Sequence, residues 1–241
     1  MHSAYLLNDL VDLPNDRKYS RKHTRPFAAG TACVKTGAIL AVLLLLAAIG
    51  IATLINPLFT WLLVLYFLTT TAYSVFLKRV VLIDVLILAG LYTTRIIAGA
   101  AAISVTPSFW LLAFSMFLFI SLAMVKRFAE LLALQELDQD SKMGRGYTVE
   151  DLETLGSHGA SAGYLSVLVL SLYINSPDVR VLYSRPEAIW LLCPLLLYWV
   201  SRIWLVARRG KMHDDPVVFA ISDRVSRLLA VIAILIVMLA L

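Results

Sequence analysis

The stretch that decides the fold class is residues 36–55, which read TGAILAVLLLLAAIGIATLI. No charged residue interrupts it, and a helix of this length rises about 30 Å, the thickness of a bilayer's hydrocarbon core. Working outward, we find similar apolar runs near residues 57–77, 80–103, 108–125, 158–175, 186–206 and 225–241. The sequence therefore predicts an all-α, polytopic transmembrane helix bundle with seven full helices.

Composition agrees with an integral membrane protein, since 60% of the 241 residues are hydrophobic and only 15% are charged. Cys33 and Cys193 are isolated, so neither a disulfide framework nor a zinc site is indicated. We find no linker, no clear internal repeat and no nucleic-acid-binding module. Residues 1–241 are therefore expected to form a single transmembrane domain.

The basic residues predict an orientation. If residues 11–35 are cytoplasmic, 18 of the 21 Lys and Arg residues lie in or beside cytoplasmic segments. Arg180 and Arg185 lie on the other side, and Arg95 lies within the membrane. This asymmetry follows the positive-inside rule. We expect a multi-pass protein of the cell (inner) membrane, with its active face in the cytoplasm.

An acidic motif precedes the first long apolar run: residues 8–16 read NDLVDLPND. On a helix, Asp9, Asp12 and Asp16 share one face, although Pro14 should end or kink that helix. Carboxylates about 6 Å apart repel each other by roughly 3 kcal/mol per pair at an effective dielectric near 20. A hard cation such as Mg²⁺ would neutralise them and could complete its shell with substrate phosphates. The alternative is a solvated acidic turn.

A basic run follows this motif directly and includes Arg17, Lys22 and Arg25. Lys and Arg beside a metal-binding carboxylate cluster could hold the remaining phosphate charge. The alternative is that the run only marks the cytoplasmic side or contacts anionic lipid headgroups.

Other polar residues gather at the predicted cytoplasmic ends of the helices and are candidates for binding phosphate. Each alone could be a simple topology signal. Asp84 and Arg95 are more informative, because a charge at mid-bilayer costs about 2.5–3.5 kcal/mol and usually faces a cavity or a partner. We expect Arg95 to line the site, the alternative being a structural pairing with a neighbouring helix. The remaining candidates are Tyr73, Lys78, Lys126, Arg127, Glu130, Arg145, Tyr147, Asp223 and Arg224.

The pattern N-D-x-x-D-x-x-x-D, followed by a basic stretch and Arg25-Pro26, resembles the first signature of the UbiA superfamily of intramembrane prenyltransferases. Several shorter motifs are closer to its decaprenyl-phosphate phosphoribosyltransferase branch. They are Tyr73…Lys78, Arg95-x-x-Ala98-Gly99, the run 126–131 (KRFAEL) and Asp223-Arg224. The second D-x-x-x-D signature of ordinary prenyltransferases is absent from its expected loop, where Glu136-x-x-x-Asp140 is only a loose substitute. This departure favours the phosphoribosyltransferase branch.

The resemblance implies nine helices around a cavity that opens laterally to lipid, so the first one or two helices would be missing here. A longer form could carry an N-terminal soluble domain. The resemblance also implies Mg²⁺ as cofactor, with Asp9, Asp12 and Asp16 as metal ligands and catalytic residues together with Glu130. The implied substrate-binding residues are Asn8, Arg17, Lys22, Arg25, Tyr73, Lys78, Arg95, Lys126, Arg127, Arg145, Tyr147, Asp223 and Arg224.

The expected partners are a polyprenyl phosphate or diphosphate lipid and a phosphorylated small-molecule co-substrate. The preferred reaction transfers 5-phosphoribose from its diphosphate to polyprenyl phosphate. Prenyl transfer from a polyprenyl diphosphate to an aromatic or other acceptor is the alternative within the family. A membrane transporter or non-enzymatic subunit is the alternative from another class.

Overall fold

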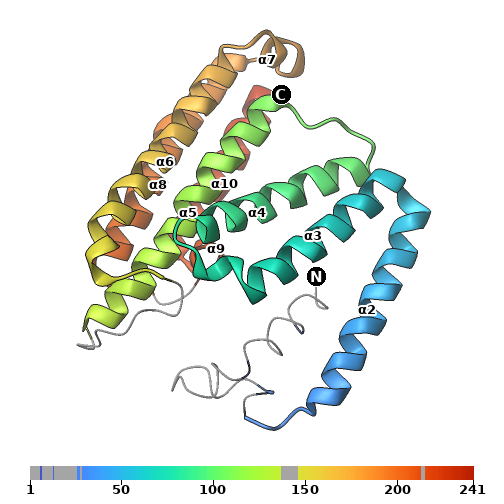
Figure 1. Ribbon diagram of the computed structural model, residues 1–241. Helices are drawn as coiled ribbons and strands as arrows, with labels where there is room; N and C mark the ends of the chain where they lie inside the picture. Colours follow the sequence, from blue (N-terminus) through green and yellow to red (C-terminus); the bar gives the residue numbers. More distant parts are fainter. Residues whose placement is uncertain (1–5, 7–12, 14–25, 28, 137–145, 213–214) are drawn as a thin grey trace. The chain divides into compact units, whose positions relative to one another are not determined.

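The computed structural model describes residues 6, 13, 26–27, 29–136, 146–212 and 215–241. Within these residues the chain forms helices and turns and no strand, which confirms the all-α prediction (Figure 1). The long helices are α2 (Val34–Ile55), α3 (Pro57–Val75), α4 (Ile83–Ala102), α5 (Phe109–Glu136), α6 (Leu152–Ile174), α8 (Leu192–Arg208) and α10 (Arg224–Ala240). Shorter elements are α7 (Pro177–Leu182), α9 (Pro216–Ser222) and the 3-10 turns η1 (Leu77–Arg79), η2 (Val149–Asp151) and η3 (Pro186–Leu191).

Six helical segments of the described chain are long and apolar enough to cross a membrane. They include α2 to α6 and the continuous stretch of η3 and α8, so the prediction of a multi-pass membrane protein is confirmed. The seventh predicted span is also helical, as α10, and its 17 residues rise about 25 Å.

Two predicted helix boundaries need correction. The fourth span was expected near residues 108–125, but α5 continues to Glu136. Phe128 and Leu131 are buried on this extension, so packing maintains the helix past its first charged residues. The next helix begins at Leu152 instead of residue 158, after a turn in which the Thr148 backbone N–H donates to Asp151 Oδ2 at 2.8 Å.

The chain divides into two compact units. One comprises the chain up to Ile87 together with Thr94–Pro107, and the other comprises Leu88–Thr93 and Ser108–Leu241. In the first unit α2 packs against α3. Only Asn56 separates these two helices; its Oδ1 accepts from the Leu58 N–H at 2.8 Å, and its Nδ2 donates to the Ala101 carbonyl at 3.3 Å.

The second unit is built on a seam where α5, α6 and α8 meet. A Cβ placed on Gly159 would lie 2.2 Å from Trp204 Cζ2, and one on Gly163 would lie 2.5 Å from Val200 Cγ1. Small residues of this kind allow membrane helices to approach closely. A buried hydrogen-bond chain crosses the seam: Trp204 Nε1 donates to Ser121 Oγ at 3.1 Å, and Ser121 Oγ donates to the Gly159 carbonyl at 2.7 Å.

Candidate functional site

The predicted site residues fall into three groups. Tyr73, Lys78 and Arg95 belong to the first unit, and Lys126, Arg127, Glu130, Tyr147, Asp223 and Arg224 belong to the second. Outside the described residues lie Asn8, Asp9, Asp12, Asp16, Arg17, Lys22, Arg25 and Arg145. In the described part of the chain, no group of three or more His, Cys, Asp or Glu residues is placed to hold a metal ion.

In the first unit, the intramembrane Arg95 of α4 contacts Tyr66 of α3. Its Nε and Nη2 donate to Tyr66 Oη at 3.1 and 2.5 Å, and its guanidinium carbon lies 5.3 Å from the centre of the Tyr66 ring. A phenolic oxygen together with an aromatic face suits the planar guanidinium. Arg95 is therefore paired with a residue of a neighbouring helix, which was the alternative that we gave for it from the sequence. Tyr66 was not among the predicted residues.

Two further charged residues of this unit are shielded from solvent. Lys78 lies on η1 and is buried, and Asp84 lies in the first turn of α4 and is fully buried. A carboxylate at that position interacts favourably with the positive end of the helix dipole. Tyr73, on the last turns of α3, is half-buried. These positions place polar groups of the unit around the α3–α4 connection.

In the second unit, two adjacent basic residues in the second half of α5 are both paired with carboxylates. Lys126 Nζ lies 2.5 Å from Asp215 Oδ2, and the fully buried Arg127 forms an ion pair with Glu130 one turn later. Asp215 also caps α9, because its Oδ1 accepts from the Val217 N–H at 3.0 Å. Glu130, predicted to be catalytic, is therefore held by its own helix. Tyr147, just before η2, is fully buried.

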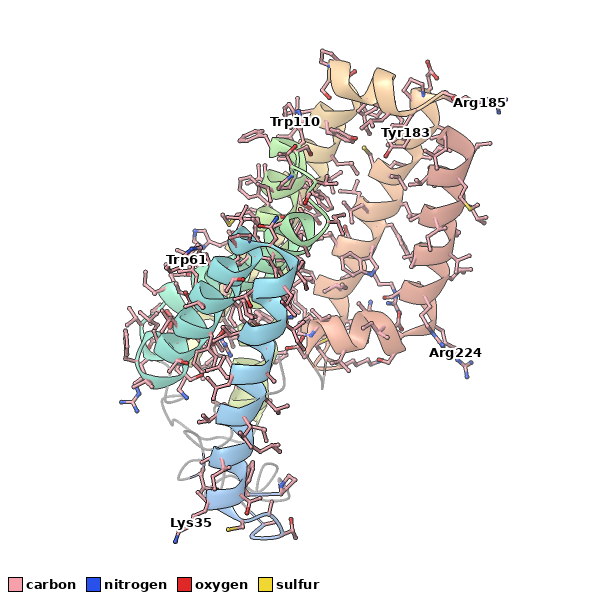
Figure 2. The ribbon with its side chains drawn as sticks, turned by 90° about the vertical axis from the view of Figure 1, so that its right-hand side faces the viewer. Lys35, Trp61, Trp110, Tyr183, Arg185 and Arg224 are labelled. Atoms are coloured by element: carbon pink, nitrogen blue, oxygen red, sulfur yellow. The ribbon has the colours of Figure 1, made fainter. Side chains whose placement is uncertain are left out.

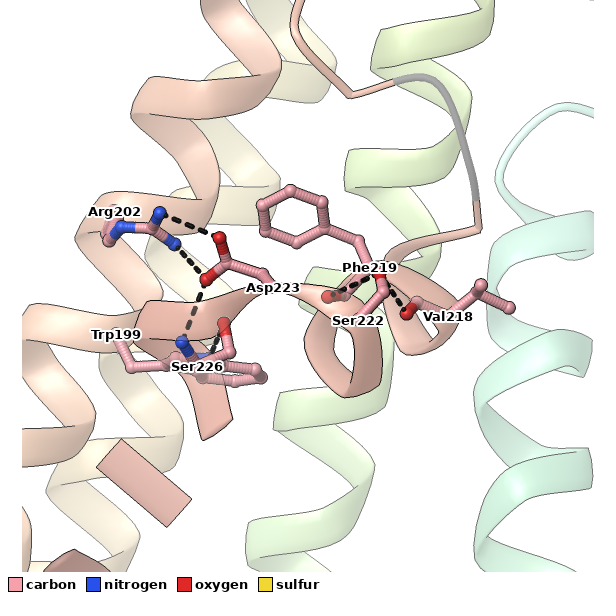
Figure 3. A network of polar contacts seen from close by, with 7 residues as sticks. All are labelled: Trp199, Arg202, Val218, Phe219, Ser222, Asp223 and Ser226. Carbon is pink, nitrogen blue, oxygen red and sulfur yellow. Dashed lines mark hydrogen bonds and ion pairs between the residues drawn. The ribbon is translucent and has the colours of Figure 1, made fainter. Parts of the chain in front are cut away.

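Asp223 is paired with Arg202, a residue of α8 that was not among the predicted site residues (Figure 3). Arg202 Nη1 and Nη2 donate to the two carboxylate oxygens at 2.7 and 3.0 Å, and the Ser226 N–H donates to Asp223 Oδ2 at 2.8 Å. Burial raises the pKa of the Asp223 carboxyl, but the bonds from Arg202 and Ser226 outweigh it, so the pKa lies below the ordinary value of 3.8. Arg224 instead is exposed and points away from the lower end of α10 (Figure 2).

A cavity of about 570 Å³ lies within the second unit, between α5, α6, α8 and α10. Its volume falls in the range typical of small-molecule sites. Its wall is mainly leucine, alanine and aromatic side chains, and one end is formed by Trp199, Ala220 and Ser226. The lining residues that define its length are Ser108, Phe114, Tyr173, Tyr183, Ile189, Leu192, Leu195, Trp199, Ser226 and Ala233.

A polytopic helical bundle with an apolar internal cavity defines an integral membrane protein equipped to hold an apolar ligand. The chain belongs to the UbiA prenyltransferase family, whose model matches residues 1–223. The resemblance seen in the sequence motifs is therefore confirmed, and the family is one of membrane transferases.

Individual relatives support the same assignment. The chain is 37% identical over 227 residues to the uncharacterized protein y4nM of Sinorhizobium fredii, covering 93% of this chain and 44% of that protein. It is 34% identical to the nodulation protein NoeC of Azorhizobium caulinodans, covering 91% of this chain and 71% of that one. A decaprenyl-phosphate phosphoribosyltransferase of Mycobacterium tuberculosis is 28% identical, covering 95% and 73%. The chain thus spans less than half the length of the first of these relatives.

A solved structure shares the fold. It comes from work on a digeranylgeranylglyceryl phosphate synthase in membranes and superposes with a TM-score of 0.64 at 18% identity. The match covers 98% of this chain and 78% of that one. At this identity the likeness shows the fold alone.

Proposed function

We propose that this chain is a Mg²⁺-dependent membrane transferase that moves 5-phosphoribose from phosphoribosyl diphosphate to a polyprenyl phosphate. The observation that carries the proposal is the apolar cavity of the second unit, which fits a prenyl tail, in a chain of the UbiA family. The choice of phosphoribosyl transfer rests on the similarity to decaprenyl-phosphate phosphoribosyltransferases over 95% of the chain.

The reaction balances as a substitution at ribose C1. A phosphate oxygen of the lipid forms a bond to C1, the bond from C1 to the diphosphate oxygen breaks, and diphosphate leaves with the electron pair. Negative charge therefore builds on the leaving group, where positioned cations stabilise it most. Asn8, Asp9, Asp12 and Asp16 offer hard oxygen donors suited to Mg²⁺, which when bound would supply positive charge at the diphosphate.

In the second unit, Lys126 and Arg127 are the cations proposed to bind phosphate oxygens. Lys126 and Arg127 already pair with Asp215 and Glu130, so a phosphate group would compete with these carboxylates for the same donors. Within the first unit taken by itself, Lys78 and Arg95 are the proposed phosphate-binding residues.

The proposal is tested with membranes from cells expressing the chain, incubated with labelled phosphoribosyl diphosphate and decaprenyl phosphate. Label should enter the lipid extract with Mg²⁺ and should stop with excess chelator. Asp9→Asn and Asp12→Asn should each lower the rate by about 100-fold or more, since each removes a metal ligand. Glu187→Gln is the matched control, because it neutralises an exposed carboxylate on η3, and it should leave the rate unchanged.

Two results would contradict the proposal. One is full activity of both aspartate variants, which would remove the metal assignment. The other is a labelled prenyl group that moves from polyprenyl diphosphate to an aromatic acid while no ribose enters the lipid. That second outcome would establish the alternative reaction of the same family.

A further inference from the structure

The short helix α9 is held at both of its ends by an aspartate that makes the same two kinds of contact. Asp215 caps α9 and pairs with Lys126 of α5. Asp223 caps α10 through the Ser226 N–H and pairs with Arg202 of α8. Each carboxylate thus fixes the start of one helix and also ties it to a long membrane helix. α9 itself packs against α5 and α10.

This corner forms one end of the apolar cavity. Ala220 of α9, Ser226 of α10 and Trp199 of α8 all line it. Trp199 Nε1 donates to Ser226 Oγ at 3.1 Å, so the cavity has a polar end (Figure 3). The wall runs from there along α8 to Leu192 and reaches Tyr183 and Ile189 at the opposite end. A lipid bound here would find the hydrogen-bonded pair of Trp199 and Ser226 at one end, a largely apolar wall along its length, and the side chains of Tyr173 and Tyr183 at the other end.

Arg202 lies three residues after Trp199, on the same side of α8, but it does not line the cavity. Its Nη1 and Nη2 donate hydrogen bonds to the two carboxylate oxygens of Asp223, and its guanidinium carbon lies 5.9 Å from the centre of the Phe219 ring. A bidentate contact fixes orientation as well as distance. Arg202 is therefore connected to the cavity wall through Asp223, which accepts from the N–H of the cavity-lining Ser226, whose Oγ in turn accepts from Trp199 Nε1.

We infer that Arg202 and Asp223 are positioning residues for the lipid substrate, which set the polar end of the cavity where the prenyl tail meets its headgroup. The tail would then extend along α8 and α10 towards Tyr173, Tyr183 and Ile189. This inference rests on the proposed function in one respect, namely that a prenyl lipid occupies the cavity. It gives Arg202 a role in lipid binding, and it explains the predicted involvement of Asp223 by the contacts that Asp223 makes with Arg202 and Ser226.

The test compares the Michaelis constants of the two substrates in four variants. Arg202→Met leaves Asp223 without its cation, whereas Arg202→Met with Asp223→Asn removes both charges and avoids an uncompensated carboxylate. In both, the KM for polyprenyl phosphate should rise by about 10-fold, while the KM for phosphoribosyl diphosphate and kcat stay within about twofold. Arg202→Lys keeps the positive charge but cannot make the bidentate contact with Asp223, so its KM for polyprenyl phosphate should lie between those of wild type and Arg202→Met. Arg227→Met, on an exposed residue of α10, should behave as wild type.

A fall in kcat with an unchanged lipid KM would overturn the inference, because a merely structural pair would act in that way. So would wild-type kinetics in the double variant. A second measurement separates this from the proposed reaction: the shift in melting temperature that polyprenyl phosphate causes in the detergent-solubilised protein. Wild type should be stabilised more than the double variant whichever group is transferred. Equal stabilisation of wild type and the double variant would overturn this inference and leave the proposed function intact. If polyprenyl phosphate does not stabilise wild type, both the inference and the proposed function are contradicted.

Discussion

Two tryptophans of α8 make the same hydrogen bond in two regions of opposite character. Trp204 donates to Ser121 and Trp199 donates to Ser226, each at 3.1 Å. Trp204 is buried against Gly159 in the α5–α6–α8 seam, whereas Trp199 lines the cavity. In a bilayer there is little hydrophobic driving force for helices to associate, because the lipid tails are as apolar as the side chains. Close packing at small residues and interhelical hydrogen bonds therefore determine which helix faces meet. Gly159 and Gly163 allow the helices of the seam to pack closely. Trp199 and Ser226 instead join α8 to α10 beside the cavity.

Breaking the seam should have the largest effect. Gly159→Val would bring its Cβ to 2.2 Å from Trp204 and 2.8 Å from Met124 Cβ. Overpacking of this kind costs about 1–3 kcal/mol or more, which is enough to unfold a marginal protein. We expect little monodisperse protein in detergent by size-exclusion chromatography. The matched control is Gly50→Val, where an added Cβ meets nothing within 4 Å. Equal yields from the two variants would refute the close approach.

Removing the two serine acceptors compares the regions directly. Ser121→Ala leaves the buried Trp204 indole N–H without its acceptor, at a cost of about 1–3 kcal/mol. Ser226→Ala leaves the Trp199 indole N–H facing a cavity, so the loss of stability should be less than half as large. Thermal melting of the two purified variants measures the difference. A larger loss for Ser226→Ala would reverse our view of the two regions.

Filling the cavity should impair function more than stability. Ala233→Trp would place a large ring in the space between α8 and α10, and we expect kcat/KM for the lipid to fall by about 10-fold. The melting temperature should stay close to that of wild type, because the ring occupies existing space. Val231→Trp is the control, since Val231 is exposed on the same helix. Normal lipid kinetics for Ala233→Trp would argue against this cavity as the tail site.

The smallest effect concerns pH. Because the pKa of Asp223 is lowered in the folded protein, its carboxylate stabilises the fold above pH 3.8, and this contribution is lost as the pH falls below 3.8 through the lowered value. The difference in melting temperature between wild type and Asp223→Asn should therefore be constant from pH 7 to 5 and shrink between pH 4 and 3. A difference that grows as the pH falls would contradict the lowered pKa.

Much of the fold could be predicted from hydropathy. The six spans and the helical seventh segment follow from apolar runs, because any uninterrupted run of that length must form a helix in lipid. The extension of α5 to Glu136 could not be predicted in this way, since Lys126 and Arg127 look like the end of a span. Packing of Phe128 and Leu131 continues the helix there.

The candidate site was less accessible to sequence reasoning. Motifs identified Lys126, Glu130 and Asp223, but not the partners that hold them. Arg202 lies 21 residues before Asp223, and Asp215 lies 89 residues after Lys126. No local pattern predicts pairs so far apart. The acidic motif at residues 8–16 lies outside the described residues, and its role as a metal site stays a prediction.

By itself, the sequence determined that this protein is a helical membrane protein, because its long apolar runs can satisfy their backbone hydrogen bonds in lipid by forming helices; its short motifs added the resemblance to the UbiA superfamily. Only the tertiary structure decided that α6 packs closely against α8 at Gly159, and that a cavity lies between α8 and α10. It also decided that Arg202 pairs with Asp223, which accepts from the N–H of the cavity-lining Ser226. The physical reason is that close packing and ion pairing depend on the three-dimensional meeting of side chains, which composition and spacing along one chain do not contain.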